Sequence, residues 1–337
     1  GSANNNFSYN FLFQLNLYKE FPKYLKRYSF DIVHSANLVH MPDIFLKFRN
    51  LNTIFIVTMH TTIEGQVKGF LKSNKNFLKM APSEKGSLIF YPYIKLLETI
   101  YLKKTNYAIT VSNKFAKILS SKGYKGSIKA IHNGIDLEEY NYRNISLNDC
   151  YKKFPNFRNK KVMLFAGRLI TQKGIELFVR LIKKFENSDY HFAIAGKGDI
   201  KSLFKLINKY KINKYKIMFL GFVDNKDLKY VYRASSIFVL PSYYENLPIS
   251  IIEAMSMKCV CIASNVGAVD ELIDNNKTGF LVNPGDFNCL VNVVNNLINN
   301  DKLHKKITEE AYKNVIDNFT IKKMCKETLN FYEDILK

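Results

Sequence analysis

Two glutamates eight residues apart occupy the segment of the sequence that is most suggestive of chemistry. Glu245 lies in a loop after an apolar run, and Glu253 lies in the first turns of the helical pattern that follows. Free amides and the dipole at the start of such a helix favour an anion such as a phosphate, and carboxylates accept hydrogen bonds from hydroxyl groups. Two solvated carboxylates are the alternative. The apolar neighbours of Glu245 at 247–249 favour a ligand site.

A second segment with suitable chemistry runs from Gly167 to Gly174, directly after an apolar run and before a helical pattern. Its two cations, Arg168 and Lys173, can converge on a diphosphate, the guanidinium as a fork and the ammonium as a point charge. Two ordinary surface cations are the alternative. A glycine pair at 196 and 198 also follows an apolar run, but this pattern is too short to indicate a site by itself.

The second half of the chain must position these residues, and its pattern is that of a doubly wound α/β domain. Short apolar runs alternate with longer amphipathic stretches, which predicts a parallel sheet covered by helices. Ligands of such a sheet bind at the carboxyl ends of its strands. A helix is predicted from about 175 to 185. The predicted strands are 162–166, 191–195, 217–220, 237–240, 260–263 and 279–282.

Fewer strands are predicted in the first half of the chain, at 31–34, 53–58, 107–111 and 128–131. A helix-like stretch at 11–28 precedes them, where a strand and a glycine-rich loop are expected in a complete domain of this class. The polar stretch 141–160 is interpreted as a linker with an outlying helix.

Length and composition agree with two folded domains. The chain has 337 residues, of which 47% are hydrophobic, so it can bury a core without disulfides or metals. Disordered and collagen-like classes are excluded. Its apolar runs are too short to cross a bilayer, and no signal-peptide pattern is found. The first two residues, Gly1 and Ser2, are typical of a tag remnant.

The net charge of +21 suggests an anionic partner. However, only seven of the 50 basic residues are Arg, the residue best suited to phosphate and base contacts. We therefore expect no nucleic-acid partner, and the lysine excess is typical of an AT-rich genome. The five cysteines are odd in number and form no CxxC pair. They are interpreted as buried thiols in a reducing cytoplasm.

Residues 60–130 are especially basic, with 13 Lys and three acidic residues, a local net charge of +10. Lysines stand beside large apolar residues at 67–72 and 77–80, and an aromatic run follows at 88–94. Such a region can lie on the anionic inner face of a membrane, as a peripheral protein would. A solvated basic face above core aromatics is the alternative.

Taken in order, the motifs of the second half resemble those of retaining glycosyltransferases of family 4, which have the GT-B fold: two Rossmann-like domains facing a cleft. The resemblance runs from about Val162 to Asp286. It includes Phe165-Ala166-Gly167-Arg168, Lys173-Gly174, Phe219-Leu220-Gly221-Phe222-Val223, Pro241-Ser242, the pair Glu245 and Glu253, and Thr278-Gly279-Phe280-Leu281-Val282. In the first half, 31–34, 58–61 and 133–136 also resemble family segments.

The resemblance implies a role for each matching residue. Arg168 and Lys173 match the cations that hold the donor diphosphate, and Glu253 matches the acceptor of ribose hydrogen bonds. Glu245 matches the residue that contacts the donor sugar. Amides near Leu247 and Ile249 match those that meet the phosphate, and Val223 matches the position beside the base. His60 matches a histidine facing the donor sugar, a better match than His34, although a histidine after a strand is often structural.

Several positions depart from the family pattern. Asn246 and Pro248 stand where glycines are expected, and Pro248 removes an amide donor. Lys258, Val260 and Ala268 also differ from the usual residues, and these changes can narrow the donor pocket. No DxD triplet that could hold Mg²⁺ follows a predicted strand. No cofactor or metal is therefore expected, and arginine, lysine and helix amides would stabilise the leaving diphosphate.

Together these features predict a metal-independent, retaining hexosyltransferase with an incomplete first domain. We expect an N-terminal domain at 3–140, a nucleotide-sugar domain at 141–320, and a helix at 321–337 that returns to the first domain. Its expected partners are a nucleotide sugar and a glycan or lipid-linked acceptor of surface polysaccharide synthesis. A catalytically silent partner subunit is the main alternative. A sugar-phosphate epimerase is disfavoured because no further acid–base cluster is found.

Overall fold

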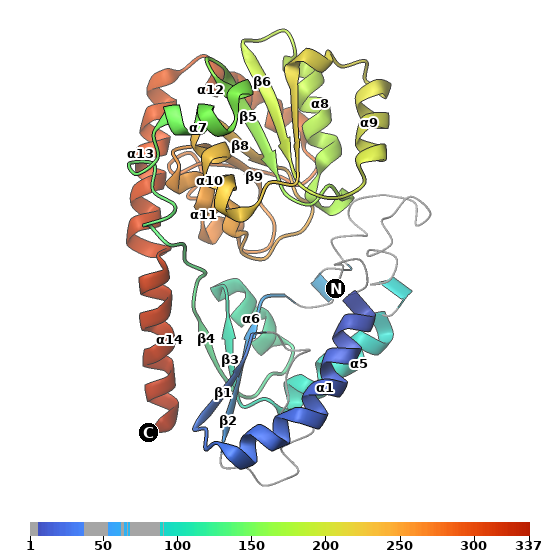
Figure 1. Cartoon of the computed structure of the whole chain (residues 1–337), viewed down its shortest axis with the longest axis vertical. Helices are drawn as coiled ribbons and strands as arrows, with labels where there is room; N and C mark the ends of the chain where they lie inside the picture. Colours follow the sequence, from blue (N-terminus) through green and yellow to red (C-terminus); the bar gives the residue numbers. More distant parts are fainter. Residues whose placement is uncertain (1–5, 37–52, 62–63, 66, 68–87, 90) are drawn as a thin grey trace. The chain divides into compact units, whose positions relative to one another are not determined.

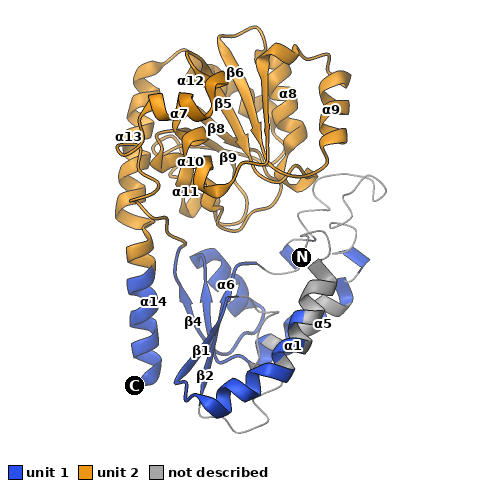
Figure 2. Cartoon of the chain, viewed as in Figure 1, with its two compact units in different colours: residues 1–132, 325–337 blue, residues 133–324 orange. Residues whose placement is uncertain are grey.

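The computed structural model describes residues 6–36, 53–61, 64–65, 67, 88–89 and 91–337. The chain forms two compact units (Figure 2): unit 1 contains residues 1–132 and 325–337, and unit 2 contains residues 133–324. None of the described helices is both long enough and apolar enough to cross a lipid bilayer. Of the basic region 60–130 that was considered for a membrane surface, residues 62–63, 66, 68–87 and 90 lie outside the described residues.

Unit 1 contains a parallel sheet of four described strands in the order β1-β2-β3-β4. The four predicted strands are confirmed, with small shifts of their ends. Buried side chains of β2 and β3 pack against Phe115 and Leu119, which form the apolar face of α6. The helix predicted at 11–28 is also present and precedes β1. The described elements are α1 (Asn6–Arg27), β1 (Ile32–Ser35), β2 (Ile54–Met59), α5 (Tyr91–Lys104), β3 (Tyr107–Thr110), α6 (Asn113–Ser121) and β4 (Ser127–Ala130).

Unit 2 contains a six-stranded parallel sheet in the order β10-β9-β8-β5-β6-β7, between helices on both faces (Figure 1). The six predicted strands are confirmed. They are β5 (Lys161–Ala166), β6 (Tyr190–Ala195), β7 (Ile217–Gly221), β8 (Ile237–Leu240), β9 (Val260–Ser264) and β10 (Phe280–Val282). Strands β8 and β9 are buried along their whole length, which explains their continuous apolar runs.

The helices of unit 2 follow its strands in alternation. The helix predicted at 175–185 is α8, whose seven buried residues belong to the core of unit 2. The helices are α7 (Leu147–Lys153), α8 (Ile175–Phe185), α9 (Ile200–Lys209), α10 (Asn225–Arg233), α11 (Ile249–Ser256), α12 (Phe287–Ile298) and α13 (Asp301–Asn318). Helix α7 is the outlying helix expected within 141–160, and Ser146 caps it by accepting a hydrogen bond from the Asp149 amide.

The last helix, α14 (Ile321–Leu336), begins in unit 2 and continues in unit 1. Within unit 1, Phe331 is buried and its ring meets the Tyr107 ring edge-to-face, with centroids 6.5 Å apart. The Tyr332 hydroxyl bonds to Nδ1 of His34, whose Nε2 lies 2.7 Å from Oγ1 of Thr58. These contacts attach the end of α14 to strands β1 and β3.

The cysteines differ from their prediction. All five are free thiols, and Cys150, Cys259 and Cys261 are buried as expected. The expectation is wrong for Cys325, which is exposed on α14, and Cys289 is only half-buried. Both lie on helices that have one buried face and one face toward solvent, and the residue type alone does not tell on which face a cysteine lies.

Candidate functional site

The topology of unit 2 places a site at the carboxyl ends of β5 and β8. The strand order reverses there: β5 is followed in space by β6 and β7 on one side and by β8, β9 and β10 on the other. Loops that leave neighbouring strands in opposite directions open a crevice at this point, which is where doubly wound sheets bind ligands. Arg168 and Lys173 follow β5, and Glu245 follows β8. Residues from distant parts of the sequence therefore meet at one end of the sheet.

Lys173 and Glu245 form a buried ion pair at this position. Nζ of Lys173 lies 2.6 Å from Oε1 of Glu245, and the exposed fractions of the two side chains are 18% and 8%. The Ser242 hydroxyl donates to the same carboxylate oxygen at 2.7 Å. A carboxylate with both an ammonium and a hydroxyl donor can be buried at a modest cost. Glu245 is thus held in one orientation, which excludes the solvated alternative considered for it.

The backbone around this pair is closely packed. The Tyr243 amide donates to the carbonyl of Gln172 at 2.8 Å, so the loops after β5 and β8 are joined directly. A Cβ at Gly174, which has φ +71°, would lie 1.9 Å from the Pro241 carbonyl oxygen. A Cβ at Gly267, with φ +59°, would lie 2.0 Å from the carbonyl oxygen of Glu245. Both positions therefore require glycine, and together they fix the loop that carries Glu245.

Arg168 differs from Lys173 in its surroundings. Its side chain is exposed and forms no ion pair with any described residue. The two cations that were predicted to act together therefore stand at one loop, but only Lys173 is engaged within the protein. The Arg168 guanidinium can therefore offer its two parallel N–H groups to a ligand phosphate, while the Lys173 ammonium stays paired with Glu245.

The start of helix α11 offers amide donors. Pro248 stands at its N-cap and supplies no side-chain hydrogen bond, and Ile249 begins the helix with an exposed side chain. Leu247 is buried, and its carbonyl accepts a hydrogen bond from the Asn133 side chain at 3.4 Å. The Ile251 amide donates to the Pro248 carbonyl at 3.2 Å, so the amides of Ile249 and Ser250 at the very start of the helix are the ones available to an anion. Pro248 itself has no N–H group, so the start of this helix has one donor fewer, as predicted.

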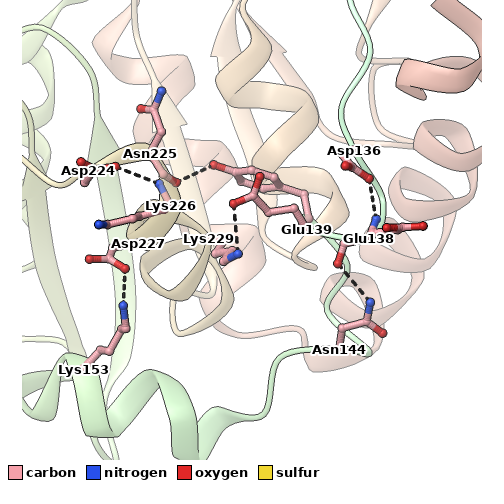
Figure 3. Close-up of polar contacts among 11 residues, drawn as sticks. Asp136, Glu138, Glu139, Asn144, Lys153, Asp224, Asn225, Lys226, Asp227 and Lys229 are labelled. Carbon is pink, nitrogen blue, oxygen red and sulfur yellow. Dashed lines mark hydrogen bonds and ion pairs between the residues drawn. The ribbon is translucent and has the colours of Figure 1, made fainter.

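Glu253 lies on α11, where it is partly buried near two tyrosines. Burial, the largest cause, and the charge of Glu139 (Figure 3) both raise the pKa of its carboxyl, which stands at about 7. The hydroxyls of Tyr232 and Tyr140 act in the opposite direction because they interact with the ionised carboxylate. The sequence predicted Glu253 but gave no signal for the tyrosines, since Tyr232 lies in the apolar pattern of α10 and Tyr140 in an irregular segment.

The loops after β6 and β7 complete this end of the sheet. Val223 is partly exposed after β7, and the neighbouring Phe222 is 58% exposed. Nζ of Lys197, from the glycine pair after β6, lies 3.7 Å from the centre of the Phe222 ring. The Leu169 amide donates to the Lys197 carbonyl at 2.7 Å, which connects this loop to that of Arg168. Phe222 and Lys197 were not predicted as site residues, although an aromatic residue beside Val223 is visible in the sequence.

The two histidines considered for the site belong to unit 1. His60 follows β2, and much of the residue is exposed. Neighbouring atoms still exclude some water from its ring, and this desolvation lowers its pKa. A hydrogen bond with the Ala36 backbone acts in the opposite direction and raises the pKa. His34 lies in β1 and contacts α14, which gives it a structural role. The place of His60 across a cleft stays a prediction.

Among the residues that the structure describes, no group of three or more His, Cys, Asp or Glu side chains is arranged to hold a metal ion. Metal independence remains a prediction.

Both halves of the chain match known glycosyltransferase families. Residues 150–314 match the profile of "Glycosyl transferases group 1", and residues 1–139 match that of "Glycosyltransferase Family 4". The two matches together cover most of the chain.

Two curated relatives support the same assignment. An uncharacterized glycosyltransferase of Methanocaldococcus jannaschii is 29% identical over 71% of this chain and 63% of its own length. The UDP-Gal:alpha-D-GlcNAc-diphosphoundecaprenol alpha-1,3-galactosyltransferase of Escherichia coli is 29% identical over 72% of this chain and 64% of its own length. The chain thus spans somewhat less than two thirds of the length of these relatives.

A solved structure extends the comparison to the whole chain. The crystal structure of a glycosyltransferase from Rickettsia africae ESF-5 is 26% identical and covers 100% of this chain and 84% of its own, with a TM-score of 0.73. Two parallel sheets and matching profiles in both halves lead to one assignment. The chain belongs to the glycosyltransferases of the GT-B fold.

Proposed function

We propose that this protein is a metal-independent, retaining glycosyltransferase that transfers a hexose from a nucleotide-diphosphate sugar to a glycan or a lipid-linked acceptor in surface polysaccharide synthesis. The observation that carries the proposal is the buried Lys173–Glu245 pair beside the exposed Arg168 at the switch point. The Escherichia coli relative is named for a nucleotide-sugar donor and a diphosphoundecaprenol acceptor, which supports the same classes of substrate here.

The charges of the site suit a departing diphosphate. Cleavage of the bond between the sugar and the phosphate leaves negative charge on the diphosphate and positive charge on the sugar. Arg168 is free to bind the diphosphate as a fork, and the first amides of α11 can bind it through the backbone. These groups would stabilise the leaving group without a metal.

The Lys173–Glu245 pair gives the donor two contacts at once. Glu245 can accept a hydrogen bond from a sugar hydroxyl, and Lys173 can donate to the diphosphate while it stays close to Glu245. Because Ser242 also donates to Glu245, the carboxylate keeps its orientation when the ammonium is shared. The pair therefore suits a ligand in which hydroxyl groups and a phosphate lie close together, because Glu245 binds the former and Lys173 the latter.

The reaction is tested by donor turnover and product configuration. The protein is incubated without added metal, and then with EDTA, in the presence of a panel of UDP-, GDP- and ADP-sugars, and proton NMR follows the anomeric signal. Slow donor hydrolysis that initially gives the α-sugar from an α-linked donor, and that EDTA leaves unchanged, is expected. A first-formed β-product contradicts retention, and loss of activity with EDTA contradicts metal independence. Tight nucleotide binding without any turnover would favour a silent partner subunit.

An anionic membrane surface is proposed as the place where the acceptor is met, on the cytoplasmic side. Helix α5 exposes Leu96 (58%) and Ile100 (37%) and carries lysines, including Lys95 and Lys103. Apolar side chains next to lysines suit a bilayer with anionic lipids. The full chain is expected to float with vesicles containing phosphatidylglycerol and not with phosphatidylcholine vesicles. L96E should reduce flotation several-fold, whereas equal recovery with both vesicles would contradict membrane binding.

A further inference from the structure

Residues 196–223, which run from the loop after β6 through α9 and β7, carry a large excess of positive charge. They contain seven lysines, one acidic residue and no arginine. The acidic residue, Asp199, caps α9, because its carboxylate accepts hydrogen bonds from the amide and the hydroxyl of Ser202. Six of the lysines are exposed, and no ion pair of the described residues includes any of the seven. The charge excess of this segment is therefore open to an anionic partner.

Helix α9 arranges its side chains in rows along the helix. Leu203 and Ile207 form the buried row and belong to the core of unit 2. Beside them lies an apolar row that is exposed: Ile200 and Phe204 have exposed fractions of 41% and 42%. A third row consists of exposed lysines four residues apart, Lys201, Lys205 and Lys209. Since residues four apart lie on the same side of a helix, an exposed apolar row runs beside a lysine row.

The exposed apolar row borders an aromatic cluster at the edge of the sheet, where Figure 1 shows α9 on the side of unit 2 opposite α13. The Phe204 ring meets that of Phe219 in β7 edge-to-face, with centroids 5.7 Å apart. Because β7 is the last strand of the described sheet, no neighbouring strand shields this pair. Phe222, directly after β7, is exposed as well, and Nζ of Lys197 lies over its ring. Among residues 133–324, all of which the structure describes, the only exposed aromatic side chains are Phe204, Tyr215 and Phe222, so the aromatic surface of unit 2 is concentrated here.

An anionic bilayer fits both exposed rows at once. Apolar side chains can enter the boundary between the lipid headgroups and the acyl chains, while the long lysine stems keep their ammonium groups among the lipid phosphates. Each lysine near such a surface strengthens the attraction. A nucleic acid fits less well, because arginine is better suited to its phosphates and bases and the segment has none. The charges and the exposed apolar groups together favour a lipid surface.

We propose that unit 2 has a membrane-contact surface of its own, in which Ile200, Phe204 and Phe222 enter the headgroup layer of an anionic bilayer and the lysine row of α9 binds lipid phosphates. This surface reaches the proposed donor site, because the loops after β5 and β6 are joined by a hydrogen bond from the Leu169 amide to the Lys197 carbonyl at 2.7 Å. The inference rests on the proposed function for its purpose, which is to hold the donor site beside a lipid-linked acceptor. The membrane contact itself is independent of turnover and of the contact proposed for α5.

Single tryptophans test the apolar row, because the chain contains none of its own. F204W and I200W are made in the full chain and mixed with vesicles of phosphatidylglycerol or of phosphatidylcholine. With phosphatidylglycerol, the emission of both variants should shift to shorter wavelengths, and brominated lipids should quench it. I316W, at an exposed position of α13, is the control and should show neither change. Unchanged emission of F204W and I200W on vesicles that float with the protein would overturn the proposal.

The lysine row is tested by a matched pair of double variants. K201Q/K205Q removes two charges four residues apart on α9, and K302Q/K306Q removes two exposed charges with the same spacing on α13. Because each lysine at an anionic surface contributes about fivefold to the affinity, K201Q/K205Q should bind phosphatidylglycerol vesicles about 25-fold more weakly. K302Q/K306Q should lose less than about twofold, since salt screens charges that lie away from the contact. Equal losses in the two variants would show that only the net charge matters, and would contradict a contact at α9.

Failure of the proposed function would look different from failure of this surface. If wild type turns over no donor, the proposed function fails, and the tryptophan shifts are still expected because they require only lipid. If L96E abolishes flotation and F204W remains unshifted, α5 alone contacts the membrane and the proposal for α9 is overturned. A shift of F204W with a single-stranded oligo-dT, without any shift on vesicles, would identify a nucleic acid as the occupant and would equally contradict the proposal.

Discussion

At the scale of single residues, the two cations of the site should respond differently to removal. K173A leaves Glu245 buried without its ammonium, whereas R168A removes an exposed side chain. We expect K173A to lower the free energy of unfolding by about 3 kcal/mol and R168A to change it by less than about 0.5 kcal/mol. Both should weaken UDP binding by about 1–3 kcal/mol. Urea unfolding and calorimetry measure the two effects.

R168A serves as the control for K173A, because only K173A is expected to change the free energy of unfolding while both are expected to change UDP affinity. If R168A destabilises the protein as much as K173A, then Arg168 has a structural partner and is not a free ligand group. If neither variant alters UDP affinity, the assignment of the diphosphate site is wrong. S242A should fall between them in stability, because Glu245 keeps its ammonium and loses one hydroxyl donor.

The sequence predicted the identity of the site residues better than their mutual contacts. Lys173 and Glu245 were predicted to bind different parts of a donor, and their direct pairing over 72 residues of sequence was not foreseen. Tyr140 and Tyr232 escaped notice because nothing in their local pattern distinguishes a buried hydroxyl that faces a carboxylate from a core aromatic. Such contacts depend on how helices pack, which a pattern along the chain does not encode.

At the scale of elements, the joint between the loops after β5 and β8 depends on one glycine. Gly174 has φ +71° and no room for a Cβ beside the Pro241 carbonyl. G174A should lower the free energy of unfolding by at least about 2 kcal/mol, because backbone strain and a steric clash add together. G221A, at φ +64° with open space around it, measures the strain alone and should cost about 1 kcal/mol. Equal losses in urea unfolding would show that the packing of the two loops matters little.

The C-terminal helix gives a second prediction at this scale. Y332F removes the hydroxyl that bonds to His34, so one imidazole nitrogen loses its partner while Phe331 remains buried. We expect a loss of about 1 kcal/mol and faster amide hydrogen exchange at the end of α14. L329A, at a leucine that is 58% exposed on the same helix, should leave exchange unchanged. Unchanged exchange in Y332F would mean that packing alone attaches the helix.

The elements themselves were predictable to different degrees. The six strands of unit 2 were found because buried parallel strands are continuous apolar runs bounded by glycine and polar residues. Helix α1 was recognised from its length and amphipathic pattern. The contacts of α14 were harder to predict, since its sequence does not say that Phe331 meets Tyr107 or that Tyr332 meets His34, which lies 298 residues earlier. Contacts at this separation follow from chain topology and leave little local signal.

At the scale of the whole molecule, burial of histidines should make the protein sensitive to acid. Burial is the largest cause that lowers the pKa of His34, His60, His191 and His304 from 6.5. The folded state therefore binds fewer protons than the unfolded state below pH 6.5. Stability is present above this pH and is lost as the pH falls through the lowered pKa values. Glu253 contributes the opposite trend, because folding raises the pKa of its carboxyl.

His304 provides a test of this balance on a single residue. Its Nε2 donates to the Ser236 carbonyl at 3.0 Å, so an added proton would bind Nδ1, and desolvation of the partly buried ring opposes that charge. H304Q can keep a donor for Ser236 and removes the titration. Thermal unfolding of the full chain between pH 5 and 8 should show a Tm that falls toward pH 5 in wild type and falls less in H304Q. E253Q should make the fall of Tm toward pH 5 steeper, because it removes the Glu253 carboxyl, whose protonation stabilises the folded state in acid. Identical slopes in wild type and H304Q would mean that His304 does not titrate over this range, and that carboxyl groups elsewhere in the protein set its acid sensitivity.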